Sequence, residues 1–207
     1  MAPFNFLIAA VAVIFLASCV EDVPREQRAN YDGNVAYYAK RYDAAIEDYK
    51  RSLASANQAA DPQYAAIAMF GLARSYAQLC QVADAEKWFK QSIAAREALP
   101  NIRHAHLTQN LLEYARFLTN SARYSDAVSL YDRAIPLLES QGMEAEDPLG
   151  YALVLDEYMV LLKRTERVNE AFSSAAKAKL LRDANAGGNP KFKPEAYPSC
   201  TYMPAPT

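Results

Sequence analysis

Apolar residues recur along the chain at helical spacing. In the second of four similar stretches, Met69, Leu72, Ala73 and Tyr76 stand at positions i, i+3, i+4 and i+7. This spacing places the four side chains on one face, which predicts an amphipathic helix. The same offsets give Leu111, Tyr114, Ala115 and Leu118 in the third stretch, Leu155, Tyr158, Met159 and Leu162 in the fourth, and the small residues Gly33 and Ala36 in the first.

Each of these helices is followed by a second apolar pattern built around one alanine. The four alanines, Ala45, Ala85, Ala127 and Ala171, are 40, 42 and 44 residues apart. Four positions after the first three alanines stand the aromatic residues Tyr49, Phe89 and Tyr131, whereas the fourth repeat has Ala175. Self-similarity at such a period is typical of a solenoid of repeated helix pairs, in which terminal repeats are often atypical.

The small residues on the first helix and the Ala…aromatic pattern on the second resemble the tetratricopeptide repeat, over roughly residues 25–185. The long period resembles the variant of about 42 residues found in kinesin light chains. The resemblance implies an all-α fold, a right-handed superhelical solenoid of four antiparallel helix pairs, followed by an irregular C-terminal tail. The expected pairs are approximately 25–60, 62–99, 103–141 and 147–185.

The N-terminus has the pattern of an export signal. An apolar run from Phe6 to Ala17 is too short for a spanning helix, which needs about 20 residues. It ends in Leu16-Ala17-Ser18-Cys19, which resembles the bacterial lipoprotein lipobox. The resemblance implies removal of residues 1–18 and acylation (palmitate included) of Cys19. Because no Lys or Arg precedes the run, an ordinary signal peptide or an uncleaved anchor is the alternative.

The segment 19–24 would then be a short membrane tether, because helical periodicity begins near Arg25. The residue after the lipidated cysteine directs sorting in lipoproteins of this type, and here it is Val20 rather than Asp. We therefore expect a periplasm-facing protein of the cell envelope, at the outer membrane rather than the inner.

Composition and motifs give no support for catalysis or for nucleic-acid binding. The net charge of −2 lacks the basic excess that nucleic acid attracts. The 3 Cys and 2 His provide no metal set, and His104 and His106 are only two positions apart. No nucleophile, zinc or phosphate-binding motif is present. We expect no enzyme activity, cofactor, metal or small-molecule substrate.

Function is therefore expected on the concave surface, which in this family is lined by the first helix of each pair. Eleven residues before the alanines stand Asn34, Arg74 and Arg116, and such a row is reminiscent of repeat domains that hold a peptide carboxylate. The alternative is that the row reflects only the abundance of Arg and Lys. The predicted partner-binding groove comprises Asn34, Tyr37, Tyr38, Phe70, Arg74, Gln78, Leu112, Arg116, Asn120, Lys163 and Arg164.

Residues 186–207, here called the tail, differ from the repeats in composition. Five prolines and the pair Gly187-Gly188 exclude another helix. Either the tail is disordered, or Phe192, Tyr197 and Tyr202 pack onto the solenoid. Cys200 could pair with Cys80 in an oxidising compartment; otherwise Cys80 is a small buried thiol and Cys200 is loose.

These patterns together predict a lipid-anchored, non-catalytic scaffold that binds a partner protein or peptide in the groove. The alternative is a structural accessory subunit of an envelope complex, of the secretion, pilus or outer-membrane assembly type, whose groove is filled by its own tail.

Overall fold

The computed structural model describes residues 23–100 and 104–200, and their regular secondary structure is entirely α-helical. The predicted signal peptide, Cys19 and Tyr202 lie outside the described residues, as does residue 103 at the start of the third predicted pair. Among the helices within the described ranges, none is both long and apolar enough to span a bilayer.

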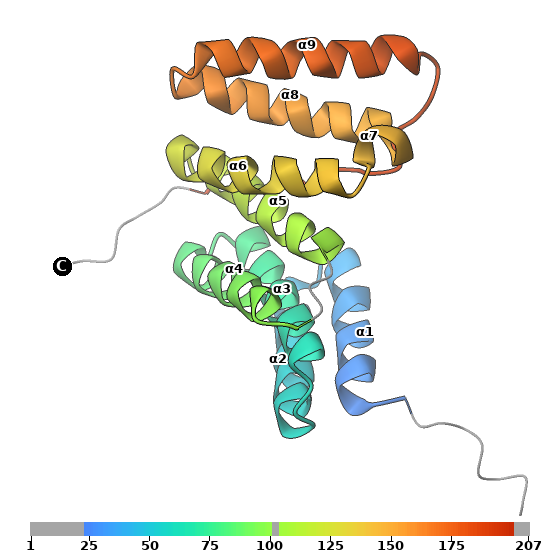
Figure 1. Cartoon of the computed structure of the whole chain (residues 1–207). Helices are drawn as coiled ribbons and strands as arrows, with labels where there is room; N and C mark the ends of the chain where they lie inside the picture. Colours follow the sequence, from blue (N-terminus) through green and yellow to red (C-terminus); the bar gives the residue numbers. More distant parts are fainter. Residues whose placement is uncertain (1–22, 101–103, 201–207) are drawn as a thin grey trace, which may run out of the picture.

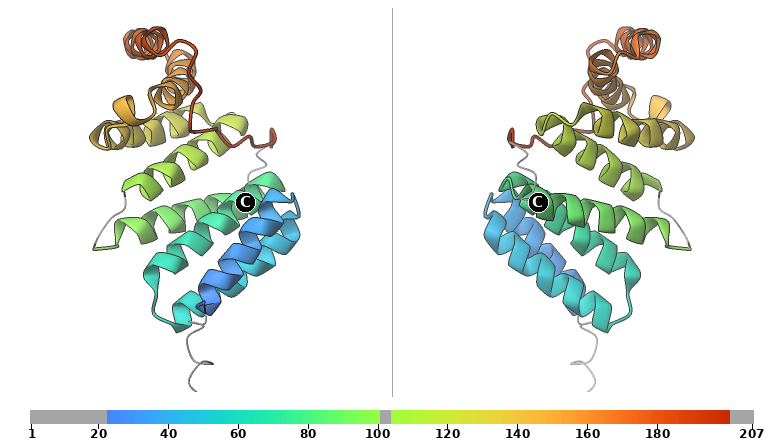
Figure 2. Two further views of the ribbon diagram at one scale, coloured as in Figure 1. Left: turned by 90° about the vertical axis from the view of Figure 1, so that its right-hand side faces the viewer. Right: turned by 90° about the vertical axis from the view of Figure 1, so that its left-hand side faces the viewer.

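The helices form four antiparallel pairs that stack in chain order (Figures 1 and 2). We call the first helix of each pair the A helix and the second the B helix. The all-α repeat fold predicted from the sequence is confirmed. The pairs are α1 (Arg25–Tyr38) with α2 (Tyr42–Gln58), α3 (Pro62–Gln78) with α4 (Val82–Glu97), α5 (His104–Asn120) with α6 (Tyr124–Ser140), and α8 (Pro148–Arg164) with α9 (Val168–Ala184); the short α7 (Met143–Glu146) precedes the last pair.

The alanines that define the repeat are fully buried where the two helices of each pair pack together. The aromatic residue one turn later fills the space between neighbouring A helices. Tyr49 of α2 is 1% exposed, and a Cβ atom built on Gly33 of α1 or Gly71 of α3 would meet its ring at 2.7 Å or less. Only glycine lets both A helices approach this ring so closely.

Each A helix passes to its B helix through the same turn. Lys40, Cys80, Ala122 and Glu166 all have positive φ, between 56° and 63°. The following N–H donates to the carbonyl five residues back, as Arg41 does to Ala36. This is the Schellman arrangement, which satisfies the last carbonyls of a helix. Glycine usually occupies this position, because it adopts a positive φ without strain, but none of these four turns contains one.

The second and last A helices begin at a capping aspartate followed by proline. Asp61 accepts a hydrogen bond from the N–H of Tyr64, and Asp147 accepts one from Gly150, both at 3.0 Å. Proline at the next position loses no helical hydrogen bond, because its missing N–H would have no partner in the first turn. These caps fix where α3 and α8 start and so place their side chains on the face described next.

Candidate functional site

The described part of the tail runs back from the end of α9 across the A helices (Figure 2). We call the surface that it covers the A-helix face. It is formed by α3, α5 and the start of α8. Residues 192–200 have neither helical nor strand structure, so their backbone groups form hydrogen bonds with side chains of the solenoid or with water.

The tail first meets the solenoid at Asp147. Its carboxylate accepts hydrogen bonds from the backbone N–H groups of Lys191 and Phe192, at 3.2 and 2.8 Å. The ring of Phe192 then lies 5.0 Å from the guanidinium carbon of Arg116. One aspartate therefore both starts α8 and holds the tail.

Glu195 occupies the second position on the face. Its carboxylate pairs with the Nη2 atom of Arg74 at 3.2 Å and accepts a hydrogen bond from Gln78 at the same distance. Gln78 also donates to the backbone carbonyl of Ala196, at 2.9 Å. Arg74 is buried, and its guanidinium stacks 4.1 Å from the ring centre of Tyr37, which favours the cation further. The anion that Arg74 binds is therefore a side chain of the same protein.

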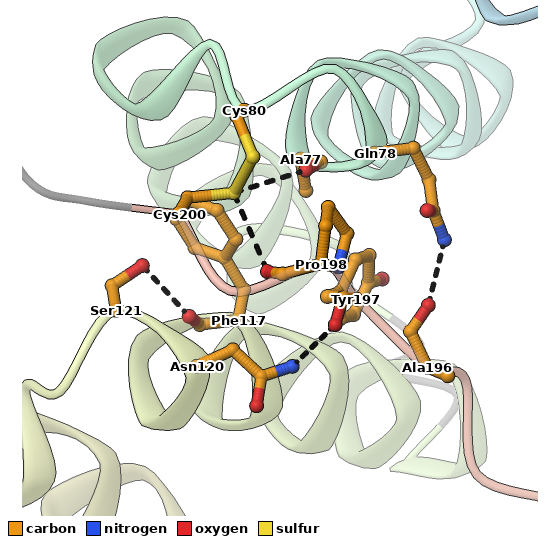
Figure 3. The surroundings of a disulfide bond; sticks show 10 residues. All are labelled: Ala77, Gln78, Cys80, Phe117, Asn120, Ser121, Ala196, Tyr197, Pro198 and Cys200. Atoms are coloured by element: carbon orange, nitrogen blue, oxygen red, sulfur yellow. Dashed lines mark hydrogen bonds between the residues drawn. A yellow bond between two sulfur atoms is a disulfide. The ribbon is translucent and has the colours of Figure 1, made fainter.

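Tyr197 enters the interior between α3, α4 and α5 (Figure 3). Its ring packs edge-on against Phe89 and Phe117, and its phenol donates to a carboxylate oxygen of Glu113 at 2.8 Å. The backbone carbonyl of Tyr197 accepts from Asn120, also at 2.8 Å. Burial, followed by the charge of Glu113, raises the pKa of the Tyr197 phenol well above its ordinary value of 10.0. The tyrosine is therefore held neutral and acts as a hydrogen-bond donor.

Cys200 closes the described tail with a disulfide to Cys80 (Figure 3). The two Cα atoms are 5.3 Å apart although the residues are 120 positions apart in the chain. Cys80 is the positive-φ residue of the turn between α3 and α4. Of the two states considered from the sequence, the paired one is present in this structure, and Cys200 is buried rather than loose.

The comparisons with known proteins agree with this architecture. Residues 30–98, which cover most of the first two helix pairs, match the family model described as "Tetratricopeptide repeat". The first two helix pairs are therefore tetratricopeptide repeats.

The solved structure of BtubC (BKLC) from P. vanneervenii is similar to this chain. The TM-score is 0.71 at 15% sequence identity, and the match covers 92% of this chain and 75% of that chain. This likeness shows the fold alone. No curated protein matches the sequence.

Arg116 of the repeat protein is not open to a ligand, unlike the role expected for it. Its Nε and Nη2 atoms bind the carboxylate of Glu157 at 2.8–3.1 Å, and Nη1 binds Glu113 at 3.0 Å. Glu157 also accepts a hydrogen bond from Tyr131 at 2.9 Å. Burial raises the pKa of the Glu113 carboxyl, and the charge of Arg116 opposes that rise. These groups form a buried network that positions Glu113 beneath Tyr197.

The other predicted groove residues divide into three groups. Phe70 and Leu112 are buried, and Leu112 lines a cavity together with Phe192. Asn34 accepts a hydrogen bond from the phenol of Tyr49 at 2.8 Å, so its amide oxygen serves the first helix pair. Tyr38, Lys163 and Arg164 are exposed. The ring of Tyr38 lies 5.9 Å from the guanidinium carbon of Arg74, and Arg164 stacks on Tyr124.

The repeat pattern did not single out Glu113, Asp147 or Glu195. A signal existed for Glu113, because it interrupts an apolar stripe between Leu112 and Tyr114. No such signal marks Glu195 within the tail. In the described ranges 23–100 and 104–200, no group of three or more His, Cys, Asp or Glu residues is arranged to hold a metal ion.

Proposed function

We propose that this protein is a lipid-anchored, non-catalytic scaffold at a bacterial envelope membrane, acting as a structural subunit with its A-helix face filled by its own tail. Tetratricopeptide repeats support a role in protein–protein interaction. The lipobox-like sequence ending in Cys19 supports the anchor. The observation that carries the proposal is the burial of Tyr197, which engages the face that a partner peptide would otherwise occupy.

The end of the stack at α9 is the surface best suited to a partner. In the third pair, Val128 of α6 is 4% exposed and Tyr124 is partly buried, because the last pair packs beside them. The corresponding residues of α9 are Phe172 and Val168, which are 66% and 49% exposed. On α6 these positions are covered by the next helix pair, whereas on α9 they are exposed. Exposed apolar residues at such positions indicate an interaction surface.

The occupant that fits this end is an amphipathic helix of another protein, continuing the stack as a further A helix would. The packing of α8 on α6 provides the pattern: Tyr131 stacks on Tyr158 across that interface at a centroid distance of 5.7 Å. Repeat proteins bury each pair against its neighbour, so an open end leaves apolar surface that a helical partner covers. Ala175 at the position of Tyr131 leaves room for the partner's own large side chain.

In the chain the proposed anchor precedes α1, whereas the open end is formed by α9, at the other end of the stack. Cys19 precedes α1 by a tether that reaches at most ~18 Å. The first helix pair would therefore lie near the membrane, and α9 would point away from it (Figure 1). This orientation suits a subunit that holds an envelope partner at a set distance from the bilayer.

Two experiments on the full chain test the proposal in the membranes of a producing bacterium. Cys19→Ala should abolish palmitate labelling and leave residues 1–18 uncleaved, which N-terminal sequencing would show. A photocrosslinking amino acid at Phe172 should give one discrete adduct with an envelope protein, which Val168→Glu should remove. The same crosslinker at Lys50, exposed on α2, is the matched control. Unchanged palmitate labelling of the Cys19→Ala variant, or equal adducts from both crosslinker positions, would contradict the proposal.

A further inference from the structure

The described tail is bound to the A-helix face in the way that a separate peptide ligand would be. Its anchors come from different elements: Asp147 at the start of α8, Arg74 and Gln78 on α3, and Asn120 on α5. Two of these anchors, Gln78 and Asn120, hold backbone carbonyls of the tail, which any sequence would provide. Such contacts fix the path of an extended segment without selecting its side chains.

The face distinguishes one peptide sequence from another through Glu195 and Tyr197, which are two positions apart. Glu195 reaches the buried Arg74, and a neutral or basic residue there would leave that guanidinium without its carboxylate. Tyr197 fills the aromatic pocket of Phe89 and Phe117, and its phenol reaches Glu113 at the bottom. A phenylalanine would leave the buried Glu113 with one donor fewer, which is costly in such a site.

The residue after Tyr197 is Pro198, which favours the extended backbone that this path requires. The segment Pro194–Pro198 reads PEAYP, with a proline on each side of the recognised pair. Prolines reduce the conformational freedom that a segment loses on binding. The minimal pattern that the face accepts is therefore Glu-X-Tyr-Pro.

We infer that the A-helix face is a recognition site for extended segments of the Glu-X-Tyr-Pro type in other proteins, and that the tail is a built-in competitor which the Cys80–Cys200 disulfide holds in place. This goes beyond the scaffold role, since it concerns a second binding surface that is closed in the disulfide-bonded form. It needs neither the lipid anchor nor the partner at α9.

Opening the site requires a dithiol reductant. Cys80 is the exposed member of the pair, whereas Cys200 is buried, so a dithiol thiolate attacks the sulfur of Cys80. The sulfur–sulfur bond breaks, and Cys200 leaves as a thiolate that takes up a proton. The second thiol of the reductant then displaces Cys80 from the mixed disulfide. The reductant ends as a disulfide, both cysteines end as thiols, and two electrons have been transferred.

Reduction alone leaves the tail tethered beside its site. A short flexible connection corresponds to an effective concentration in the millimolar range. A competing segment must therefore be abundant or bind more tightly than the tail. For the same reason, a test in solution must weaken the tail itself as well as remove the disulfide.

The test uses the full chain in detergent micelles with the double change Cys200→Ser and Tyr197→Ala, which removes both the disulfide and the main anchor of the tail. The probe is a fluorescein-labelled peptide PKFKPEAYPS, which reproduces residues 190–199. Fluorescence anisotropy should show saturable binding. Probes with the tyrosine replaced by alanine, or the glutamate by lysine, should bind at least tenfold more weakly. The disulfide-bonded wild-type chain should bind none of them.

A second measurement tests the inference even if the variant that lacks Tyr197 does not fold. The variant Cys200→Ser with Glu195→Lys keeps Tyr197 but weakens the tail's hold on Arg74, and a peptide PKFKPEAYPSC should form a mixed disulfide with its Cys80 in a glutathione buffer. Mass spectrometry should find one peptide per chain, formed at least tenfold faster than with the tyrosine-to-alanine peptide. Equal rates or equal affinities for the matched peptides would overturn the inference, and would leave the lipid anchor and the α9 surface untouched.

Discussion

Gly71 of α3 lies against Tyr49 of α2 so closely that a Cβ atom on the glycine would stand 2.5 Å from Cε1 of the ring. Helix-interior glycine normally costs about 0.5–1 kcal/mol relative to alanine, so Gly71→Ala should stabilise an isolated helix. In this protein the clash prevails, because the ring is 1% exposed and has no free space to enter. We predict a loss of about 1–3 kcal/mol in the free energy of unfolding.

Urea denaturation of Gly71→Ala, Tyr49→Leu and the double variant measures this coupling. The smaller leucine should reduce the cost of Gly71→Ala, so that the double variant is more stable than the sum of the single effects predicts. Additive effects would show that the two residues do not contact each other in solution.

Ala122 offers a stabilising change. It is exposed and has φ of 59° in the turn between α5 and α6, a conformation in which a Cβ atom is unfavourable. Ala122→Gly should raise the free energy of unfolding by about 1 kcal/mol. The matched control is Ala94→Gly on the exposed face of α4, where the same replacement should cost about 1 kcal/mol. A loss of stability in both variants would contradict the turn geometry.

The raised pKa of the Tyr197 phenol predicts that the free energy of unfolding decreases at alkaline pH. Its folded pKa is raised well above 10.0, chiefly by burial, so the unfolded chain ionises first as pH rises. The stabilisation that the neutral phenol contributes is complete below about pH 10 and should fall by about 1.4 kcal/mol per pH unit above it.

Tyr197→Phe isolates this effect, since it keeps the ring and every other tyrosine. Near pH 8 the variant should be less stable than the wild type by about 1 kcal/mol, the value of one hydrogen bond. The difference should shrink and reverse by about pH 11 in urea titrations. A difference independent of pH would mean that the phenol is exposed to solvent.

The disulfide should make a large contribution to global stability, because it joins residues 120 positions apart. Closing so long a loop restricts the unfolded chain by about 2–5 kcal/mol. Cys200→Ser should lose this amount, and the wild type in excess dithiol should match the variant. Ser199→Ala, at the exposed neighbouring position, should leave the urea midpoint unchanged. Equal midpoints for wild type and Cys200→Ser would contradict the pairing.

The fold could be predicted from the sequence because each repeat contains the residues that determine how its two helices pack. The spacing of Ala45, Ala85 and Ala127 reports where helices pack, and aromatic residues at fixed offsets report what fills the gaps. Prolines also indicate where α3 and α8 begin. These are local rules, so a single sequence contains them.

The site was harder to predict, because it depends on contacts between distant segments. The row of Arg74 and Arg116 was found from the repeat, but nothing local shows that Glu195 and Glu157 neutralise it. The tail has no periodicity, so packing and disorder could not be distinguished from composition. Cys80 and Cys200 were the one pair that suggested where the tail returns.

The central claim is that the tail lies across the A-helix face, and disulfide mapping tests it most directly. Proteolysis of the purified chain without reductant, with free thiols blocked beforehand, should give one peptide pair joined through Cys80 and Cys200. That pair should separate on reduction, with Cys19 absent from it. Blocked free thiols at both Cys80 and Cys200, or either residue joined to a different cysteine, would contradict the placement of the tail.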